Sequence, residues 1–147
     1  MKTIEYILKV KGYNMWSIPP SASVYDAIKM MADNEVGALL VIEAGKLVGI
    51  ISERDYTRKV ILKGRSSKDT LVREIMTSPV LYTTPNQTIE NCMALMTAKH
   101  VRHLPVFVND RLIGIVSIGD LVKAIISEQK ILIQKLENYI LEQSSIT

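Results

Sequence analysis

The residues best suited to chemistry are a serine and an aspartate that occur twice at the same spacing. Ser52 is followed three positions later by Asp55, and Ser117 is followed in the same way by Asp120. Each serine comes directly after a stretch that reads apolar, apolar, Gly, apolar, apolar. A strand that runs into Ser-x-x-Asp predicts a helix beginning at the serine.

Two functions fit this pattern, and both depend on the free N–H groups at a helix start. In the first, the serine and the acidic residue form a capping box that satisfies those groups. In the second, the N–H groups and the serine hydroxyl bind a phosphate, while the aspartate accepts hydrogen bonds from ribose hydroxyls. Gly49 and Gly114 suit a close approach to the strand backbone. The pattern therefore indicates either helix caps alone or an adenine-nucleotide site.

The two copies differ in their basic residues. Arg54 and Arg58 follow the first serine, and arginine binds phosphate oxygens bidentately. The alternative is a solvated helix face with i,i+4 pairs such as Asp55–Lys59. Near the second copy the basic residues come before the preceding strand: Lys99, His100, Arg102 and His103. The two histidines have no cysteine or acidic ligand close in sequence, so no metal site is predicted.

The elements that must position these residues also recur, at an offset of 65 positions and without a gap. This is an internal duplication. Each half predicts the order strand, helix, strand, strand, helix. The first half has an extended segment at 15–18, a helix opened by Ser23, strands at 37–42 and 47–51, and a helix from Ser52 to about Leu62. The second half has an extended segment at 80–83, a helix opened by Thr88, strands at 103–108 and 111–116, and a helix from Ser117 to about Leu141. Short helices are expected at 3–10 and 73–76.

Composition limits the function classes. The 147 residues are 48% hydrophobic and 22% charged, as in soluble globular proteins. The net charge of +3 is mild and scattered, which argues against nucleic-acid binding. The single cysteine, Cys92, lies in an apolar helical pattern and is predicted to be a core residue in a reducing compartment. No signal-peptide pattern and no apolar run of roughly 20 residues is seen, so a cytoplasmic location without membrane contact is expected.

The duplication resembles a tandem pair of cystathionine β-synthase (CBS) domains, also called a Bateman module. The resemblance is carried by Gly49-Ile50-Ile51-Ser52-x-x-Asp55, by Gly114-Ile115-Val116-Ser117-x-x-Asp120, and by Val101-Arg102-His103-Leu104-Pro105-Val106. It implies an α/β (α+β) fold of two βαββα repeats, packed sheet to sheet with pseudo-two-fold symmetry. The expected domains are 10–66 and 74–130, with an N-terminal helix at 1–9 and a C-terminal helix extension at 131–147. Glu53-Arg54-Asp55-Tyr56 with Arg58-Lys59 is similar to a subgroup of stand-alone two-domain CBS proteins.

The resemblance also implies a function. Such modules bind AMP, ADP, ATP, NAD or S-adenosylmethionine in two clefts between the repeats, and act as energy or metabolite sensors for a partner protein. Matched residue by residue, Ser52 and Asp55 fall on the ribose and phosphate contacts of the first cleft, and Ser117 and Asp120 on those of the second. The base or ribose contacts fall on Ser17, Ile18, Thr83 and Thr84. The cleft walls fall on Gly37, Ala38, Leu39, His103, Leu104 and Pro105. Arg102 has Gly37 as its counterpart, so its guanidinium would serve the second cleft only, and the two sites need not hold the same ligand.

The final helix raises the question of a partner. It carries an apolar seam close to a seven-residue repeat: Val122, Ile125, Gln129, Leu132, Leu136 and Tyr139. This seam either docks on its own chain together with the N-terminal helix or pairs with a second chain, and the resemblance to disc-like homodimers favours a homodimer. No nucleophile–base pair, Walker-type loop or metal cluster is present, so an enzyme is not predicted. The remaining alternative is a structural dimerisation module with empty clefts.

Overall fold

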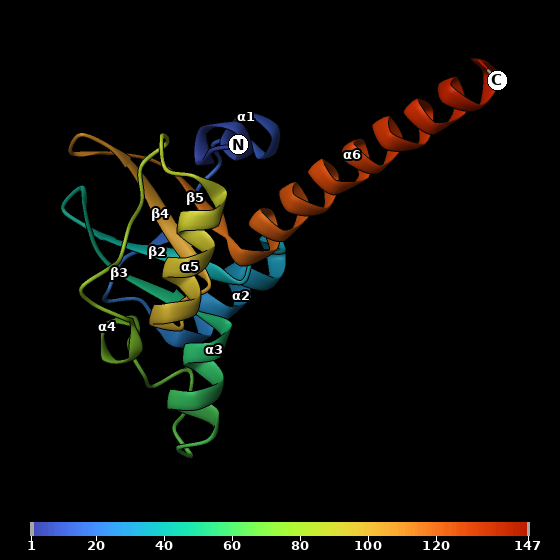
Figure 1. The fold of residues 1–147 in the computed structure, drawn as a ribbon. Helices are drawn as coiled ribbons and strands as arrows, with labels where there is room; N and C mark the ends of the chain where they lie inside the picture. The colour runs from blue at the N-terminus through green and yellow to red at the C-terminus, as the bar shows by residue number, and fades with distance from the viewer. Residues whose placement is uncertain (1, 147) are drawn as a thin grey trace. The chain divides into compact units, whose positions relative to one another are not determined.

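The structure is a computed structural model that describes residues 2–146, with side chains to residue 143, and it divides into two compact units (Figure 1). The first-repeat unit comprises residues 14–82. The second-repeat unit comprises residues 83–146 together with the N-terminal segment, residues 2–13. The mixed α/β class and the long C-terminal helix predicted from the sequence are confirmed.

The first-repeat unit contains a three-stranded sheet in the order β1-β2-β3. Strand β1 is parallel to β2, and β2 is antiparallel to β3. The elements are β1 (Ser17–Ile18), α2 (Val24–Asn34), β2 (Ala38–Glu43), β3 (Lys46–Ser52), α3 (Glu53–Tyr56), the π-helix η1 (Thr57–Ile61) and α4 (Val72–Ile75). The predicted helix from Ser52 to about Leu62 is therefore present, with α3 and η1 as its two parts.

The second-repeat unit contains the antiparallel pair β4–β5. Its elements are α1 (Ile4–Lys11), α5 (Ile89–Lys99), β4 (His103–Val108), β5 (Arg111–Ser117) and α6 (Ile118–Ile146). The extended segment predicted at 80–83 is reduced to one parallel bridge, Thr83 with Val106. The reason lies in Pro105, which occupies the position of Leu40. Leu40 donates its N–H to the Trp16 carbonyl at 3.0 Å, whereas proline has no N–H to donate.

Helix starts and ends recur between the units. The hydroxyls of Ser23 and Thr88 accept hydrogen bonds from the backbone N–H groups of Asp26 and Asn91, at 3.1 and 3.0 Å. Both predicted helix starts are thereby confirmed. At the far ends, Glu35 and the equivalent His100 both adopt left-handed backbone conformations, with φ of 54°.

Each unit has its own apolar core beneath its sheet. The first core contains Ile18, Val24, Ala27, Met31, Leu39, Val41, Ile51, Val60, Val72 and Ile75. The second contains Ile4, Ile7, Leu8, Ile89, Cys92, Met96, Leu104, Val106, Val116, Leu121 and Ala124. Cys92 is buried, as predicted, and burial raises the pKa of its thiol, so it is suited to packing rather than to nucleophilic chemistry.

Helix α1 precedes the first repeat in the sequence but packs in the second-repeat unit. Ile4 and Leu8 are almost completely buried in the second core. The backbone N–H groups of Ile4 and Glu5 donate to the carbonyls of Gln87 and Pro85, at 3.0 and 2.9 Å. This helix is therefore a structural part of the second repeat.

Helix α4 precedes the second repeat in the sequence but packs in the first-repeat unit. The N–H groups of Val72 and Arg73 donate to the carbonyls of Ala22 and Pro20, at 2.8 and 3.0 Å. Residues 20 and 22 correspond to 85 and 87 at the repeat offset of 65 positions. Helices α1 and α4 thus hold equivalent places, and each repeat is completed by the helix that precedes the other repeat in the chain.

Helix α6 is 29 residues long, about 43 Å at 1.5 Å per residue, and continues beyond the predicted end at Leu141. Figure 1 shows it as one continuous helix running away from β5. Its first turns are anchored by the buried residues Leu121 and Ala124. From Gln129 to Gln143 every residue is exposed. No helix in the described part of the chain is long and apolar enough to cross a membrane.

Candidate functional site

The first Ser-x-x-Asp forms a complete capping box at the start of α3. The Asp55 N–H donates to Ser52 Oγ at 3.2 Å. In return, Asp55 Oδ2 accepts from the Ser52 N–H at 2.9 Å and from the Ser52 hydroxyl at 3.1 Å. The predicted cap is confirmed, and it occupies one oxygen of the carboxylate.

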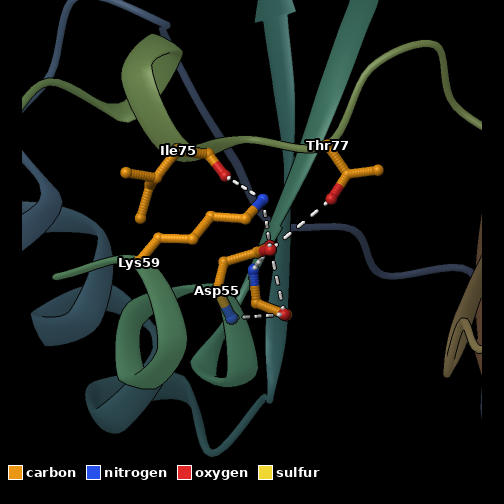
Figure 2. A network of polar contacts seen from close by, with 5 residues as sticks. Asp55, Lys59, Ile75 and Thr77 are labelled. Carbon is orange, nitrogen blue, oxygen red and sulfur yellow. Dashed lines mark hydrogen bonds and ion pairs between the residues drawn. The ribbon is translucent and has the colours of Figure 1, made fainter. Parts of the chain in front are cut away.

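The other oxygen of Asp55 is also in use (Figure 2). Asp55 Oδ1 pairs with Lys59 Nζ at 3.0 Å and accepts from the Thr77 hydroxyl at 3.5 Å. Lys59 Nζ also donates to the Ile75 carbonyl at 2.8 Å. The predicted i,i+4 pair is present, and Lys59 ties the carboxylate to the end of α4.

The second Ser-x-x-Asp repeats the cap but has a different cation. The Ser117 N–H donates to Asp120 Oδ2 at 2.8 Å, and the Asp120 N–H donates to Ser117 Oγ at 3.2 Å. Lys11 Nζ donates to the same Oδ2 at 2.6 Å and to the Ile115 carbonyl at 2.8 Å. Lys11 was not among the predicted site residues, because it lies 109 positions from Asp120 and no local pattern links the two.

In the second-repeat unit, Lys11 takes the place that the backbone of Thr77 holds in the first-repeat unit. Ile115 corresponds to Ile50, whose carbonyl accepts from the Thr77 N–H at 2.8 Å. In the second-repeat unit, α1 continues as a helix to Lys11, and the lysine ammonium reaches the equivalent carbonyl. Lys11 therefore substitutes for an extended segment of backbone, and it adds a positive charge beside Asp120.

The glycines of the two copies allow close packing within each unit. A Cβ at Gly49 would lie 2.5 Å from the Met76 sulfur, and one at Gly114 would lie 2.9 Å from Leu8 Cδ2. The sequence suggested that these glycines admit a ligand close to the strand, but in the structure the space beside them is filled by side chains of the protein itself, Met76 next to α4 and Leu8 on α1.

The other predicted residues of the first-repeat unit gather around the same end of its sheet. The Gly37 carbonyl accepts from the Glu53 N–H at 3.0 Å, and Ala38 is paired with Ser52. Ser17 is exposed on β1, whereas Ile18 and Leu39 are buried in the core. Arg54 is half-buried on α3, and Arg58 is exposed on η1.

The second-repeat unit has the equivalent arrangement. The Arg102 carbonyl accepts from the Ile118 N–H at 2.8 Å, and His103 is paired with Ser117. Leu104 and Pro105 are buried, while Arg102 is exposed.

The two predicted threonines of this unit point in different directions. The Thr83 side chain is buried, and its hydroxyl lies 3.2 Å from the Cys92 sulfur. The Thr84 hydroxyl is half-buried and donates to Asn86 Oδ1 at 2.6 Å. Of the two hydroxyls, that of Thr84 is the better placed for a ligand.

Two grooves lie beside the caps. In the first-repeat unit, a groove of about 500 Å³ runs between α2 and α3 and is lined by Ile28, Met31, Ala32, Glu35, Val36, Gly37, Glu53, Tyr56 and Thr57. In the second-repeat unit, a groove of about 290 Å³ runs between α1 and α6 and is lined by Tyr6, Ile7, Val10, Lys11, Asp120, Lys123, Ala124 and Ser127. Within the described residues, no group of three or more His, Cys, Asp or Glu side chains could hold a metal ion.

The pKa of Asp120 is determined by the burial of its side chain and by its hydrogen-bond partners. Burial acts to raise the pKa of this carboxyl, but the hydrogen bonds from Lys11 and from the Ser117 backbone outweigh burial and hold the pKa below its ordinary value of 3.8. When folding lowers the pKa of a carboxyl group, the ionised carboxylate stabilises the fold at pH values above the pKa of the unfolded state. That contribution is lost as the pH falls through the folded pKa.

Because the pKa of Asp120 is lowered, we expect the difference in unfolding free energy between wild type and Asp120→Asn to depend on pH in the acid range. In urea denaturation, wild type should be the more stable above pH 3.8, and the difference should shrink as the pH falls below it. Lys11→Met should lose the same acid-sensitive contribution, because Lys11 is one of the groups that lower the pKa. A difference independent of pH down to pH 2 would contradict the assigned ion pair.

The fold and the site define a tandem-repeat protein in which each repeat ends its strand hairpin in a capped Ser-x-x-Asp. The CBS domain family model matches residues 10–61 and 72–127. The chain therefore belongs to the CBS domain family, which confirms the resemblance seen in the sequence. CBS pairs are generally regulatory ligand-binding modules, and their stand-alone forms are generally not catalytic.

Individual relatives support this placement. The chain is 43% identical over 148 residues to the mitochondrial CBS domain-containing protein CBSX3 of Arabidopsis thaliana, covering 94% of this chain and 71% of the relative. The structure of a putative signal-transduction protein with CBS domains from Burkholderia ambifaria is 50% identical, with a TM-score of 0.84, covering 87% and 96% of the two chains. The CBS domain pair of protein MJ0100, solved with methylthioadenosine and S-adenosyl-L-methionine, has the same fold at 22% identity and a TM-score of 0.77, covering 87% and 98%.

Proposed function

We propose that this protein is a regulatory module that binds an adenosine ligand, AMP, ADP, ATP or NAD, and senses energy or metabolite state for a partner protein. The observation that carries the proposal is the duplicated Ser-x-x-Asp, held at the end of a strand hairpin in both units. In each copy a lysine ammonium lies on the carboxylate, so ribose acceptors and a phosphate-binding cation are adjacent. The MJ0100 complex with two adenosine compounds is consistent with this ligand class.

In this proposal the ligand contacts follow the residues predicted from the family. Asp55 and Asp120 accept from ribose hydroxyls, and Ser52 and Ser117 lie beside them. Arg54, Arg58, Arg102 and His103 supply further polar contacts. Ser17 and Thr84 are the exposed or half-exposed hydroxyls near the strand starts. Buried Ile18, Leu39, Leu104 and Pro105, with Gly37, Ala38 and Thr83, shape the wall behind them.

Thermal melting with a ligand panel tests the proposal. At 100 times its dissociation constant, a bound ligand should stabilise the fold by about 2.7 kcal/mol, which is several degrees for a chain of this size. AMP, ADP, ATP, NAD and S-adenosylmethionine form the panel, and inorganic phosphate is the control. A melting temperature that no member of the panel changes would favour the alternative, a structural module without a physiological nucleotide.

Substitutions then separate ligand binding from capping. Asp55→Ala and Asp120→Ala each remove part of a cap, which costs about 0.5–2 kcal/mol. If the aspartates only cap helices, both variants melt earlier but respond to ligand as wild type does. If they bind ribose, at least one variant loses the ligand-induced shift.

We also propose a homodimer, because α6 exposes an apolar seam well beyond the part that packs on its own unit. A ligand would bias the conformation felt by the protein partner only through its different affinities for two states. Catalysis has no candidate machinery in this proposal. The cytoplasmic location expected from the sequence stays a prediction, and the Arabidopsis relative is a mitochondrial protein.

A further inference from the structure

The two ribose-binding aspartates of the proposed function differ in how many of their acceptor sites are already filled. An ionised carboxylate has about four lone-pair positions for hydrogen bonds. Asp55 uses both oxygens: Oδ2 accepts from the Ser52 N–H and hydroxyl, and Oδ1 accepts from Lys59 and Thr77. A ribose at Asp55 must displace one of these partners.

Asp120 is different. Its Oδ2 accepts from the Ser117 N–H and from Lys11. Both of these geometrically defined hydrogen bonds end on the same oxygen, and the Ser117 hydroxyl also acts on the carboxylate, helping to lower its pKa. The side chain keeps 18% of its surface exposed, so the carboxylate is reachable from solvent. Two lone-pair positions on one oxygen match the two hydroxyls of a ribose.

The groove beside Asp120 continues with cationic and hydroxyl groups. Asp120, Lys123 and Ser127 lie on one face of α6, at i, i+3 and i+7, and Lys11 lies opposite on α1. Lys11 uses two of the three donors of its ammonium, on Asp120 and on the Ile115 carbonyl. Lys123 is exposed, and within the part of the chain that the structure describes its ammonium makes no ion pair. With two lysines and one carboxylate, the groove has an excess positive charge.

We infer that the groove between α1 and α6 is the phosphate subsite of the second repeat, and that the second repeat is the site that fills first with a phosphorylated adenosine ligand. The inference rests on the proposed function and adds which repeat binds and what recognises the phosphate. Asp120 Oδ1 accepts from the ribose hydroxyls, and Lys123 with the third donor of Lys11 binds the phosphate oxygens. Helix α1 forms one wall of the site, so the start of the chain takes part in binding at its second repeat.

Titration calorimetry with AMP and with adenosine tests this on the full chain. Wild type should bind one AMP per chain first, and at least about tenfold more tightly than adenosine, since a hydrogen bond to a charged group contributes that much. Lys123→Met should weaken AMP binding about tenfold and leave adenosine binding unchanged. Lys130→Met, an exposed lysine of the same helix outside the groove, should change neither.

The aspartates supply the second readout. Asp120→Asn should abolish the first binding event, whereas Asp110→Asn, at an exposed aspartate in the turn between β4 and β5, should retain it with the wild-type affinity. Equal affinities for AMP and adenosine, or a Lys123→Met variant that binds AMP as wild type does, would overturn the phosphate subsite. Loss of the first event in Asp55→Asn but not in Asp120→Asn would overturn the order of filling. If neither AMP nor adenosine binds, the proposed function itself fails, which is a distinct outcome.

Discussion

Leu8→Ala should destabilise the second repeat by about 2–5 kcal/mol and leave the first repeat largely intact. Leu8 is 1% exposed, lies in the second core, and fills the space above Gly114. Truncation removes apolar contacts and leaves a cavity, even though the substitution lies before the first repeat in the sequence. Amide hydrogen exchange should show lower protection in β4 and β5 and little change in β2 and β3.

A control on the same helix separates packing from helix propensity. Val10 is 72% exposed, so Val10→Ala should change the free energy of unfolding by less than about 0.5 kcal/mol. If Leu8→Ala instead lowers protection in β2 and β3, the assignment of α1 to the second-repeat unit is wrong.

Leu132→Glu combined with Leu136→Glu should convert the proposed dimer to a monomer. These leucines are 56% and 53% exposed in the single chain, and burial of a leucine contributes about 1.5–3 kcal/mol. Two lost leucines per chain should therefore raise the dimer dissociation constant by more than about a hundredfold. Sedimentation velocity at micromolar concentration measures the change.

The matched control adds the same charge at the same spacing on another face of α6. Gln134→Glu with Asn138→Glu places two glutamates four residues apart, away from the seam, and should leave the dimer intact. A wild-type chain that sediments as a monomer, or a control that dissociates as readily as the leucine variant, would contradict pairing through the seam.

The sequence predicted most of the fold because the signals were local and repeated. Strand β4 has the predicted bounds, and Ser52 and Ser117 cap helices as their spacing requires. The extended segment at 80–83 was predicted too long. Pro105 lacks the N–H that would pair with this segment, and that loss can be foreseen only once the pairing of the residues is known.

The site was less predictable, because its cations come from different places in the chain. Lys59 pairs with Asp55 within one helical turn, which spacing indicates. Lys11 reaches Asp120 only because α1 packs on the second repeat, and no pattern in the sequence assigns α1 to that repeat. Likewise, no pattern in the sequence indicates that the Leu8 side chain packs against Gly114.

The exchange of α1 and α4 between repeats has a consequence for how this duplication can evolve. Deleting the first repeat together with its leading helix would strip the second core of Ile4 and Leu8, and deleting the second repeat with its leading helix would strip the first core of Val72 and Ile75. A repeat can therefore be lost without damage to the other core only if the helix that leads it in the chain stays behind. This favours inheritance of the two repeats together, and while both persist Asp55 and Asp120 can diverge in role.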